Sequence, residues 1–328
     1  TDDACGLPGG CTHTSNYAAC GGTACEVGVC ADGSCSKTPR YGATYWPGRR
    51  VRALLADGDG WIAALHVAVT STEASAPPAS NRWMRLDAAG QGFSDLPVHM
   101  TQVHAVTRAV QGDVVFAGSV AVAKDGGSST TDAAMIRVGI DGSPRWRRTY
   151  HREAEDRLLA VVGLKDDTVA ACGRTAKAGG AGEAWYVRGS APTGFPLYDY
   201  IFGSAYDETC NALLPLAGDQ LLMVGAQTPN SGNGQALAFR ITENAKLVWN
   251  RSWGGKGHDE VFAAALRPGG DTWLAGSCAN QPSGAPQGCL WLLNEKGDLL
   301  MTRQVLKPGL GGAVAPVAAE LFAVSVQP

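Results

Sequence analysis

The chain between residues 206 and 305 contains the same pattern twice. Each copy opens with an acidic pair, Asp207-Glu208 or Asp259-Glu260, and continues with four apolar runs of strand length separated by turns and one polar loop. The same order of runs occurs three more times upstream, over residues 49–98, 99–151 and 154–203. Five copies with a period of about 50 residues restrict the chain to a repeat architecture.

The runs within each repeat predict an all-β fold. They are short and rich in β-branched and aromatic residues, which excludes helical solenoids of similar period. Four short strands per repeat are typical of a β-propeller blade. A β-sandwich is the alternative, but a sandwich does not repeat one unit five times.

The two ends of the repeat array predict a sixth blade. Residues 309–328 contain two further strand-like runs, and Tyr41–Trp46 is a lone aromatic strand before the first complete repeat. A propeller closes its ring because open strand edges invite aggregation. We therefore expect a six-bladed β-propeller whose last blade is closed by the N-terminal strand. The third strand of that blade is either missing or supplied by residues 29–34.

The first 40 residues form a separate, cysteine-rich segment. Six of the ten cysteines lie here: Cys5, Cys11, Cys20, Cys25, Cys30 and Cys35. So short a glycine-rich stretch buries too little apolar surface to fold alone, so we expect disulfides. A zinc module is the alternative, but close CxxC pairs are missing and only His13 is nearby. The predicted domains are a disulfide-stapled cap over 1–40 and a propeller over 41–328, and the pairing in the cap stays open.

The other four cysteines predict two disulfides in the propeller. Cys278 and Cys289 flank one loop, whereas Cys172 ends the second strand of the third repeat and Cys210 begins the first strand of the fourth. These strand ends share one face of a propeller, so both pairs can form. Disulfides persist in oxidising compartments, which predicts a protein that is secreted or held on the outer cell surface.

Charge and hydropathy limit the classes of partner. The net charge is −3 and only 17 % of residues are charged, so no basic surface for nucleic acid or an anionic membrane is expected. No apolar run approaches the roughly 20 residues that span a bilayer. The sequence opens at Thr1 without a signal peptide, as expected for a mature or trimmed chain. The expected partner is a glycan or a protein at the cell surface, and the oligomeric state stays open.

Two motifs resemble those of known bacterial proteins. The pieces Trp253–Gly255, Asp259-Glu260 and Asp141–Trp146 resemble the repeats of bacterial cell-surface propellers, and this resemblance covers residues 41–328. The segment Ala24–Cys35 resembles short Cys-rich stretches near the N-termini of secreted myxobacterial proteins. The resemblance implies a propeller fold and a secreted protein. It implies no particular activity, because propellers host many chemistries.

The loops indicate which face of the propeller carries the function. With the strands of a repeat labelled a to d, the b–c connections are long and polar: residues 69–80, 119–132, 174–183, 226–236 and 277–288. The turns on the opposite face are short. Long loops on a rigid scaffold are where binding usually occurs, so we expect the b–c loop face to be functional.

Aligned first strands predict a site at the mouth of the central channel. A variable column contains Arg52, His104, Leu159, Asn211 and Ala263, beside a column of alanines at 53, 105, 160, 212 and 264. The small alanines are expected at contacts between blades, and the variable column is expected to face the channel. Arg52, His104 and Asn211 are therefore candidate ligand-binding residues. A water-filled channel with unselected polar residues is the alternative.

The acidic pairs are candidate metal ligands. Asp207, Glu208, Asp259 and Glu260 begin first strands on one face, and carboxylates from several loops suit Ca²⁺ as a possible cofactor. The alternative is structural, because repeated residues usually have repeated structural roles. Each acid would then accept backbone N–H bonds at a turn or pair with a third-strand arginine: Arg85, Arg137, Arg188 or Arg240.

His99-Met100 and His104 offer soft ligands that suit copper, but a third ligand is not evident. No G-x-S-x-G, H-E-x-x-H or P-loop motif occurs. The sequence therefore favours an extracytoplasmic binding protein that presents its b–c loops to a glycan or protein partner. The alternatives are a hydrolase or lyase with its site at the channel mouth, and a Ca²⁺- or copper-binding protein.

Overall fold

The computed structural model is all-β and consists of two compact units, Thr1–His99 and Met100–Pro328. It describes residues 2–6, 10–14, 25–31, 34–41, 49–58, 60–67, 81–87, 92–123, 129–176, 180–229, 232–279 and 287–305. Every regular element in these ranges is a β-strand. Within them, no helix has the length and apolarity to cross a membrane. The predicted domain boundary after residue 40 stays a prediction.

The first unit opens with two antiparallel hairpins. They are formed by β1 (Asp2–Gly6) with β2 (Gly10–Thr14), and by β3 (Cys25–Ala31) with β4 (Ser34–Tyr41). Their registers set Cys5 opposite Cys11 and Cys30 opposite Cys35. Cys20 lies outside the described residues, and the cysteine pairing of the cap stays a prediction.

The first repeat then folds into one four-stranded antiparallel sheet, here called blade 1. Its strands are β5 (Arg49–Asp57), β6 (Gly60–Val67), β7 (Asn81–Leu86) and β8 (Gly92–Val98). Ala63, Leu65 and Met84 from the middle strands form its small buried cluster. The strand order follows the sequence, as expected for a propeller blade.

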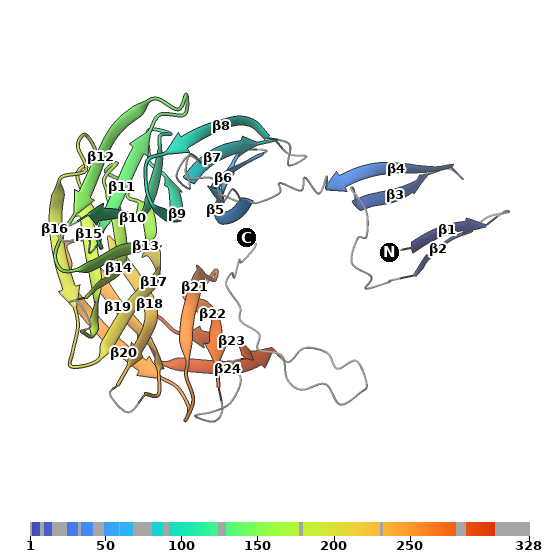
Figure 1. Ribbon diagram of the computed structural model, residues 1–328. Helices are drawn as coiled ribbons and strands as arrows, with labels where there is room; N and C mark the ends of the chain where they lie inside the picture. Colours follow the sequence, from blue (N-terminus) through green and yellow to red (C-terminus); the bar gives the residue numbers. More distant parts are fainter. Residues whose placement is uncertain are drawn as a thin grey trace. The chain divides into compact units, whose positions relative to one another are not determined.

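The second unit contains four such groups of four strands in succession (Figure 1), and the parallel pairing of Thr131 with Glu155 joins the first two groups into one eight-stranded sheet. Blade 2 is β9 (Gln102–Arg108), β10 (Val114–Ala123), β11 (Ser129–Val138) and β12 (Pro144–Tyr150). Blade 3 is β13 (Glu155–Gly163), β14 (Val169–Ala176), β15 (Gly182–Gly189) and β16 (Pro196–Phe202). Blade 4 is β17 (Asp207–Leu216), β18 (Gln220–Thr228), β19 (Gln235–Thr242) and β20 (Leu247–Trp253). Blade 5 is β21 (Glu260–Leu266), β22 (Thr272–Cys278), β23 (Gln287–Leu293) and β24 (Leu299–Val305).

The arrangement of these sheets is propeller-like. The a strands of neighbouring blades contact one another, β9 with β13, β13 with β17, and β17 with β21. The d strands β12, β16 and β20 lie on the outer side (Figure 1). The predicted all-β, propeller-like fold is thus confirmed. The six-blade count and ring closure stay predictions, because residues 42–48 and 306–328 lie outside the described residues.

Apolar side chains between adjacent blades form the core. Between blades 3 and 4, Tyr186, Phe202, Leu221, Met223 and Phe239 belong to one buried cluster. The rings of Phe202 and Phe239 lie 5.4 Å apart across this interface. Each large side chain buried this way contributes about 1.5–3 kcal/mol, so blade-to-blade packing is the main source of stability.

Every a strand carries a β-bulge at the same place. The register shift leaves one unpaired residue in each blade: Arg52, His104, Leu159, Asn211 and Phe262. In blades 2 to 5 a glycine pairs just before the bulge, and a Cβ there would lie 1.9–2.0 Å from a strand-a carbonyl oxygen. The bulged column matches the predicted variable column in four blades. In blade 5 the prediction is off by one residue, since Phe262 is bulged and Ala263 belongs with the alanines.

Third-strand arginines connect neighbouring blades on the face of the a–b and c–d turns, called the turn face. Arg137 bonds Asp113 of its own blade at 2.8 Å. It also bonds Asp167 and the Ala191 carbonyl of the next blade, at 3.0 and 3.1 Å. Arg188 likewise bonds Asn244 of the next blade at 2.8 Å. The predicted pairing of these arginines with the acids at the start of strand a is therefore wrong.

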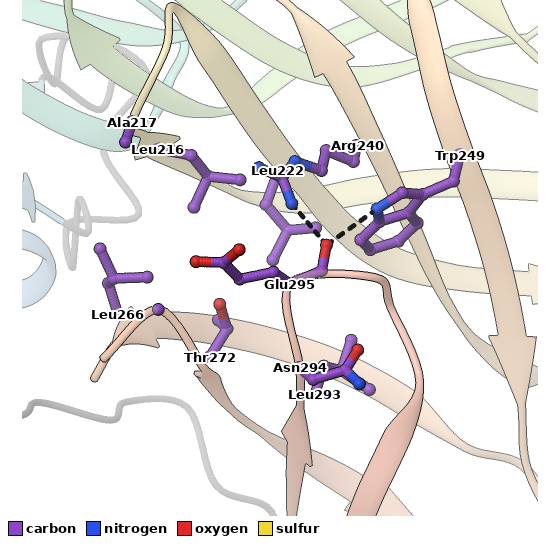
Figure 2. A pocket seen from close by; sticks show the side chains of 11 residues that line it. Leu216, Ala217, Leu222, Arg240, Trp249, Leu266, Thr272, Leu293, Asn294 and Glu295 are labelled. Atoms are coloured by element: carbon purple, nitrogen blue, oxygen red, sulfur yellow. Dashed lines mark hydrogen bonds between the residues drawn. The ribbon is translucent and has the colours of Figure 1, made fainter. Parts of the chain in front are cut away.

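Figure 2 shows the same connection between blades 4 and 5. The Arg240 guanidinium and the Trp249 indole both donate to the carbonyl oxygen of Glu295, the indole at 3.2 Å. Leu216, Leu222 and other aliphatic side chains complete a cavity of about 60 Å³. Its donors bond a backbone carbonyl of the protein, so the cavity belongs to the joint between blades.

Both predicted disulfides of the propeller are present. Cys172–Cys210 joins β14 of blade 3 to β17 of blade 4, with Cα atoms 5.7 Å apart. Cys278–Cys289 joins β22 to β23 within blade 5. Disulfides indicate an oxidising, extracytoplasmic environment.

In blades 2 to 5, the b–c connections are shorter than the sequence predicts. In blade 2, β10 and β11 remain paired to Ala123 and Ser129, so most of the predicted loop 119–132 is strand. Its Val, Ala and Thr residues pair across a β-ladder although its Gly and Ser content is typical of loops. In blade 4, the connection spans only the residues between Thr228 and Gln235.

Candidate functional site

A polar cleft of about 250 Å³ opens where strands a begin and strands b end, on the face of the b–c and d–a connections, here called the loop face. It collects side chains from blades 3, 4 and 5. Most of its lining is charged or polar: Arg174, Asp207, Glu208, Thr209, Asn211, Thr228, His258 and Glu260. Four predicted site residues, namely Asp207, Glu208, Asn211 and Glu260, are therefore in one cleft.

Asp207 is fixed by an ion pair with the preceding blade. Its Oδ1 accepts bonds from Arg174 Nε and Nη2 at 3.0 and 2.9 Å, and from the Gly182 N–H at 2.8 Å. The Asp207 side chain is 45 % exposed, so its outer edge remains accessible to a ligand.

Glu208 is the most deeply buried charged group of the cleft, with 1 % of its surface exposed. Its Oε1 accepts a bond from the Ser204 hydroxyl. Its Oε2 has no hydrogen-bond partner among the described residues. Burial raises the pKa of Glu208, and the neighbouring Glu183 and Asp207 charges add to this, although the Ser204 hydroxyl acts in the opposite direction.

Asn211 reaches across to blade 5 because it is the bulged residue of β17. A bulge re-aims a side chain out of the regular alternation of a strand. Its Nδ2 donates to Glu260 Oε1 at 2.8 Å and to the Val261 carbonyl at 2.9 Å. The other oxygen of Glu260 lies 3.3 Å from His258 Nε2. Asn211 and His258 thus both hold Glu260.

One buried acid recurs at the start of strand a in blades 3, 4 and 5. These acids are Asp156, Glu208 and Asp259, each two residues before the residue that pairs with the strand-b glycine. Asp156 accepts the Arg152 N–H at 2.7 Å, and Asp259 accepts the Gly255 N–H at 2.8 Å, in each case from four residues earlier. These are the bonds that the turn interpretation predicts.

The two acidic pairs of the sequence are therefore not equivalent. Asp259 corresponds to Glu208, and Glu260 corresponds to Thr209. Asp259 is 4 % exposed, burial raises its pKa, and it is not part of the cleft lining. The four-acid Ca²⁺ set is thus divided between the cleft and a turn, and it stays a prediction.

The remaining predicted site residues lie elsewhere. Arg52 is exposed on β5 of the first unit, whereas His104 is half-buried on β9 in blade 2. Neither lines the cleft that contains Asn211. His99 ends the first unit. The channel-mouth site and the copper site therefore stay predictions.

A second cluster, not predicted from sequence, lies where blade 2 meets blade 3. His151 Nδ1 is 2.9 Å from Asp132 Oδ1 and 3.7 Å from Asp156 Oδ2. Among the described residues, this is the one group of three donor side chains whose ligand atoms lie within 4.8 Å of one another. Imidazole and carboxylate together suit a divalent transition metal. Asp156 is already occupied by the Arg152 and Glu153 N–H groups.

No protein-family model matches this chain, and no curated protein is detectably related to it in sequence. Among solved structures, it is similar to a protein of unknown function from Dyadobacter fermentans. The TM-score is 0.54 at 11 % identity, covering 81 % of this chain and 89 % of that one. The microbial sialidase Hz136 has a TM-score of 0.49 at 11 % identity, covering 78 % of this chain and 58 % of that one. Only the first score exceeds 0.5, and such identities indicate a shared fold rather than a shared activity.

The fold and the cysteines together define the class. The chain is a disulfide-bonded, all-β protein of propeller-like architecture, with an acidic cleft on its loop face.

Proposed function

We propose that this protein is an extracytoplasmic binding protein and that the acidic cleft on its loop face binds a glycan. The supporting observation is that Asp207, Glu208, Asn211 and Glu260, drawn from two repeats, line one cleft of about 250 Å³. Carboxylates and amides in a concave site supply the directional hydrogen bonds that sugar hydroxyl groups require. The size of the cleft suits one terminal sugar of a longer chain.

Preorganisation supports the same proposal. The Cys172–Cys210 disulfide anchors β17 immediately beside Thr209 and Asn211. Asp207 is bonded to blade 3 and Asn211 to blade 5, so the cleft residues are held from both sides. A site held rigid before binding loses less conformational entropy when its ligand arrives.

A glycan array tests the proposal. The wild-type protein is compared with Asn211→Ala, which removes the bond to Glu260, and with Glu295→Gln as a matched control on the turn face. Glu295 contributes its backbone carbonyl to the joint between blades, so this control leaves that contact in place. We expect glycans that bind wild type and Glu295→Gln, with signals at least about tenfold weaker for Asn211→Ala. If no glycan on the array binds the wild-type protein, the proposal is wrong.

A hydrolase is the second candidate, and one observation favours it. Glu208 has a raised pKa in the same cleft as Asp207, which is paired with Arg174. A buried carboxyl group with a raised pKa beside a second carboxylate is an arrangement that glycoside hydrolases use for acid–base catalysis. Release of nitrophenol from aryl glycosides by wild type, and its loss in Glu208→Gln, would establish this function. No release from any aryl glycoside would exclude it for those substrates.

A further inference from the structure

The nitrogen donors of the cleft are already bonded to the protein itself. Arg174 donates through Nε and Nη2 to Asp207. Asn211 Nδ2 donates to Glu260 and to the Val261 carbonyl, which uses both of its hydrogens. His258 Nε2 faces Glu260 at 3.3 Å. The cleft therefore offers a ligand few hydrogen-bond donors.

Acceptors remain in the same lining. The bonds to Arg174 and Gly182 use only Oδ1 of Asp207, so Oδ2 remains available as an acceptor among the residues that the structure describes. Glu208 Oε2 has no partner among the described residues although the side chain is 1 % exposed. A buried carboxylate oxygen without a hydrogen-bond partner destabilises the folded protein, and a cation bound in the cleft offsets this cost through its charge.

The net charge of the cleft is negative, which also favours a ligand that donates hydrogen bonds. Its lining contains three carboxylates, Asp207, Glu208 and Glu260, against one guanidinium, Arg174. With His258 neutral and all three acids ionised, the formal charge is −3 + 1 = −2. Partial burial reduces the screening of these charges by water, so the cleft attracts a cation.

A single metal ion fits this arrangement less well than an organic cation. The ligand atoms of Asp207, Glu208, His258 and Glu260 include no three that lie within 4.8 Å of one another, since the one such group in the described chain is at Asp132. Calcium requires six to eight oxygen ligands at about 2.3–2.6 Å. An ammonium group instead directs three N–H donors at separate acceptors.

We infer that the cleft selects a glycan whose terminal sugar carries a protonated amine, with Asp207 Oδ2 as the acceptor for the ammonium group and the buried carboxylate of Glu208 supplying negative charge beside it. This inference rests on the proposed function and adds the chemical class of the ligand. It predicts that N-acetylation of the amine, which removes its charge and two of its donors, weakens binding.

The inference also predicts proton-linked binding. Burial raises the pKa of Glu208, and an ammonium ligand favours its ionised form. Binding therefore releases a proton, and affinity rises with pH until Glu208 is ionised without ligand. Glu208→Gln should remove this part of the pH dependence, because glutamine does not titrate.

The test is calorimetric titration of the full chain with a tetramer of β-1,4-linked glucosamine and with its fully N-acetylated form. Wild type and the control Glu295→Gln are expected to bind the amine form at least about tenfold more tightly. Asp207→Asn and Glu208→Gln should each lose this preference. Asp207 is half-exposed, so its substitution keeps the test valid if Glu208→Gln does not fold.

The outcomes separate this inference from the proposed function. Equal affinities, or tighter binding of the N-acetylated form, would contradict the amine selectivity while the glycan site stands. Binding of calcium chloride that depends on Glu208, without binding of glucosamine, would assign the cleft to a metal ion and overturn the inference. If neither tetramer binds while the array identifies a neutral glycan, the amine inference is wrong and the proposed glycan site is retained.

Discussion

Asp156, Glu208 and Asp259 occupy one register position in three successive blades, and all three are buried. Two of them accept backbone N–H bonds from the d–a turn before them. In Glu208 the turn bond comes from the Ser204 side chain instead, and the second oxygen has no hydrogen-bond partner in the part of the chain that the structure describes. The acid at this register position thus stabilises the d–a turn in blades 3 and 5, whereas in blade 4 it lines the cleft.

The scaffold role predicts the effect of removing Asp156. It accepts the Arg152 and Glu153 N–H groups and the Thr175 hydroxyl, the last at 2.6 Å. Asp156→Ala leaves these buried donors without an acceptor, which should lower the free energy of unfolding by about 3 kcal/mol. Urea denaturation measures this loss. The neighbouring variant Glu155→Ala, whose side chain is 49 % exposed, should change it by less than about 1 kcal/mol.

The raised pKa of Glu208 predicts how its substitution depends on pH. The folded protein binds more protons than the unfolded chain between the unfolded and folded pKa values of Glu208. The contribution of Glu208 to stability therefore falls as pH rises through that window. Glu208→Gln should gain stability relative to wild type as pH rises through the window between the unfolded and folded pKa values of Glu208, with a constant difference above the folded pKa. If the difference in the free energy of unfolding between Glu208→Gln and wild type does not change with pH, the raised pKa of Glu208 is contradicted.

At the scale of elements, joints between blades are built from repeated polar contacts on the turn face. Arg137 has only 4 % of its side chain exposed and contacts Asp113, Asp167 and the Ala191 carbonyl. Arg137→Ala leaves two partly buried carboxylates without their cation, so we expect a loss of about 3–5 kcal/mol. Arg145→Ala is the control, because its side chain is 50 % exposed and 3.6 Å from Asp113. Thermal denaturation of the two variants measures this difference, with the large loss of stability expected only for Arg137→Ala.

The disulfides are expected to differ in their effect. Cys172–Cys210 closes 38 residues and joins two blades, whereas Cys278–Cys289 closes 11 residues within one blade. Chain entropy predicts losses of about 4 and about 3 kcal/mol for the paired serine variants. Only the first pair should also weaken glycan binding, since Cys210 adjoins Asn211. Equal binding by both variants would show that the cleft does not need this anchor.

The strand pattern was predictable because each strand is an apolar run bounded by turn residues. The loop lengths were not, since residues such as Thr130 and Thr131 fit either a polar loop or a β-ladder. The one-residue error in blade 5 arose from the bulge. A bulge adds a residue without changing the apolar pattern, so Phe262 and Ala263 cannot be distinguished by sequence periodicity.

The sequence predicts individual residues of the candidate site, but it does not predict that they lie together. Asp207, Glu208 and Glu260 were recognised as polar residues at strand starts, and Asn211 as a departure from the repeat. Their convergence on one cleft depends on contact between blades, which no local pattern encodes. The cluster of Asp132 with His151 was missed because it arises where β11 bridges to β13 through Thr131 and Glu155.

At the scale of the whole molecule, the second unit combines a repeated scaffold with one departure from repetition. The bulges, the buried acids and the arginine joints recur from blade to blade. The acidic lining of the blade 4 cleft does not recur, because the cleft of about 120 Å³ at the equivalent place in blade 2 is lined by Thr101, Gln102 and Arg157 instead. Among the described residues, Glu208 Oε2 also has no partner, and Asn211 reaches into blade 5. We therefore expect ligand effects to be local to this cleft.

Hydrogen–deuterium exchange with and without an array-selected glycan tests most directly whether the cleft is the binding site. We expect slower amide exchange at residues 204–211 and 257–261 on binding, with the turn-face segments 140–144 and 294–298 unchanged. Glycan-dependent protection confined to the turn face, with residues 204–211 unaffected, would contradict the assignment of the cleft as the binding site.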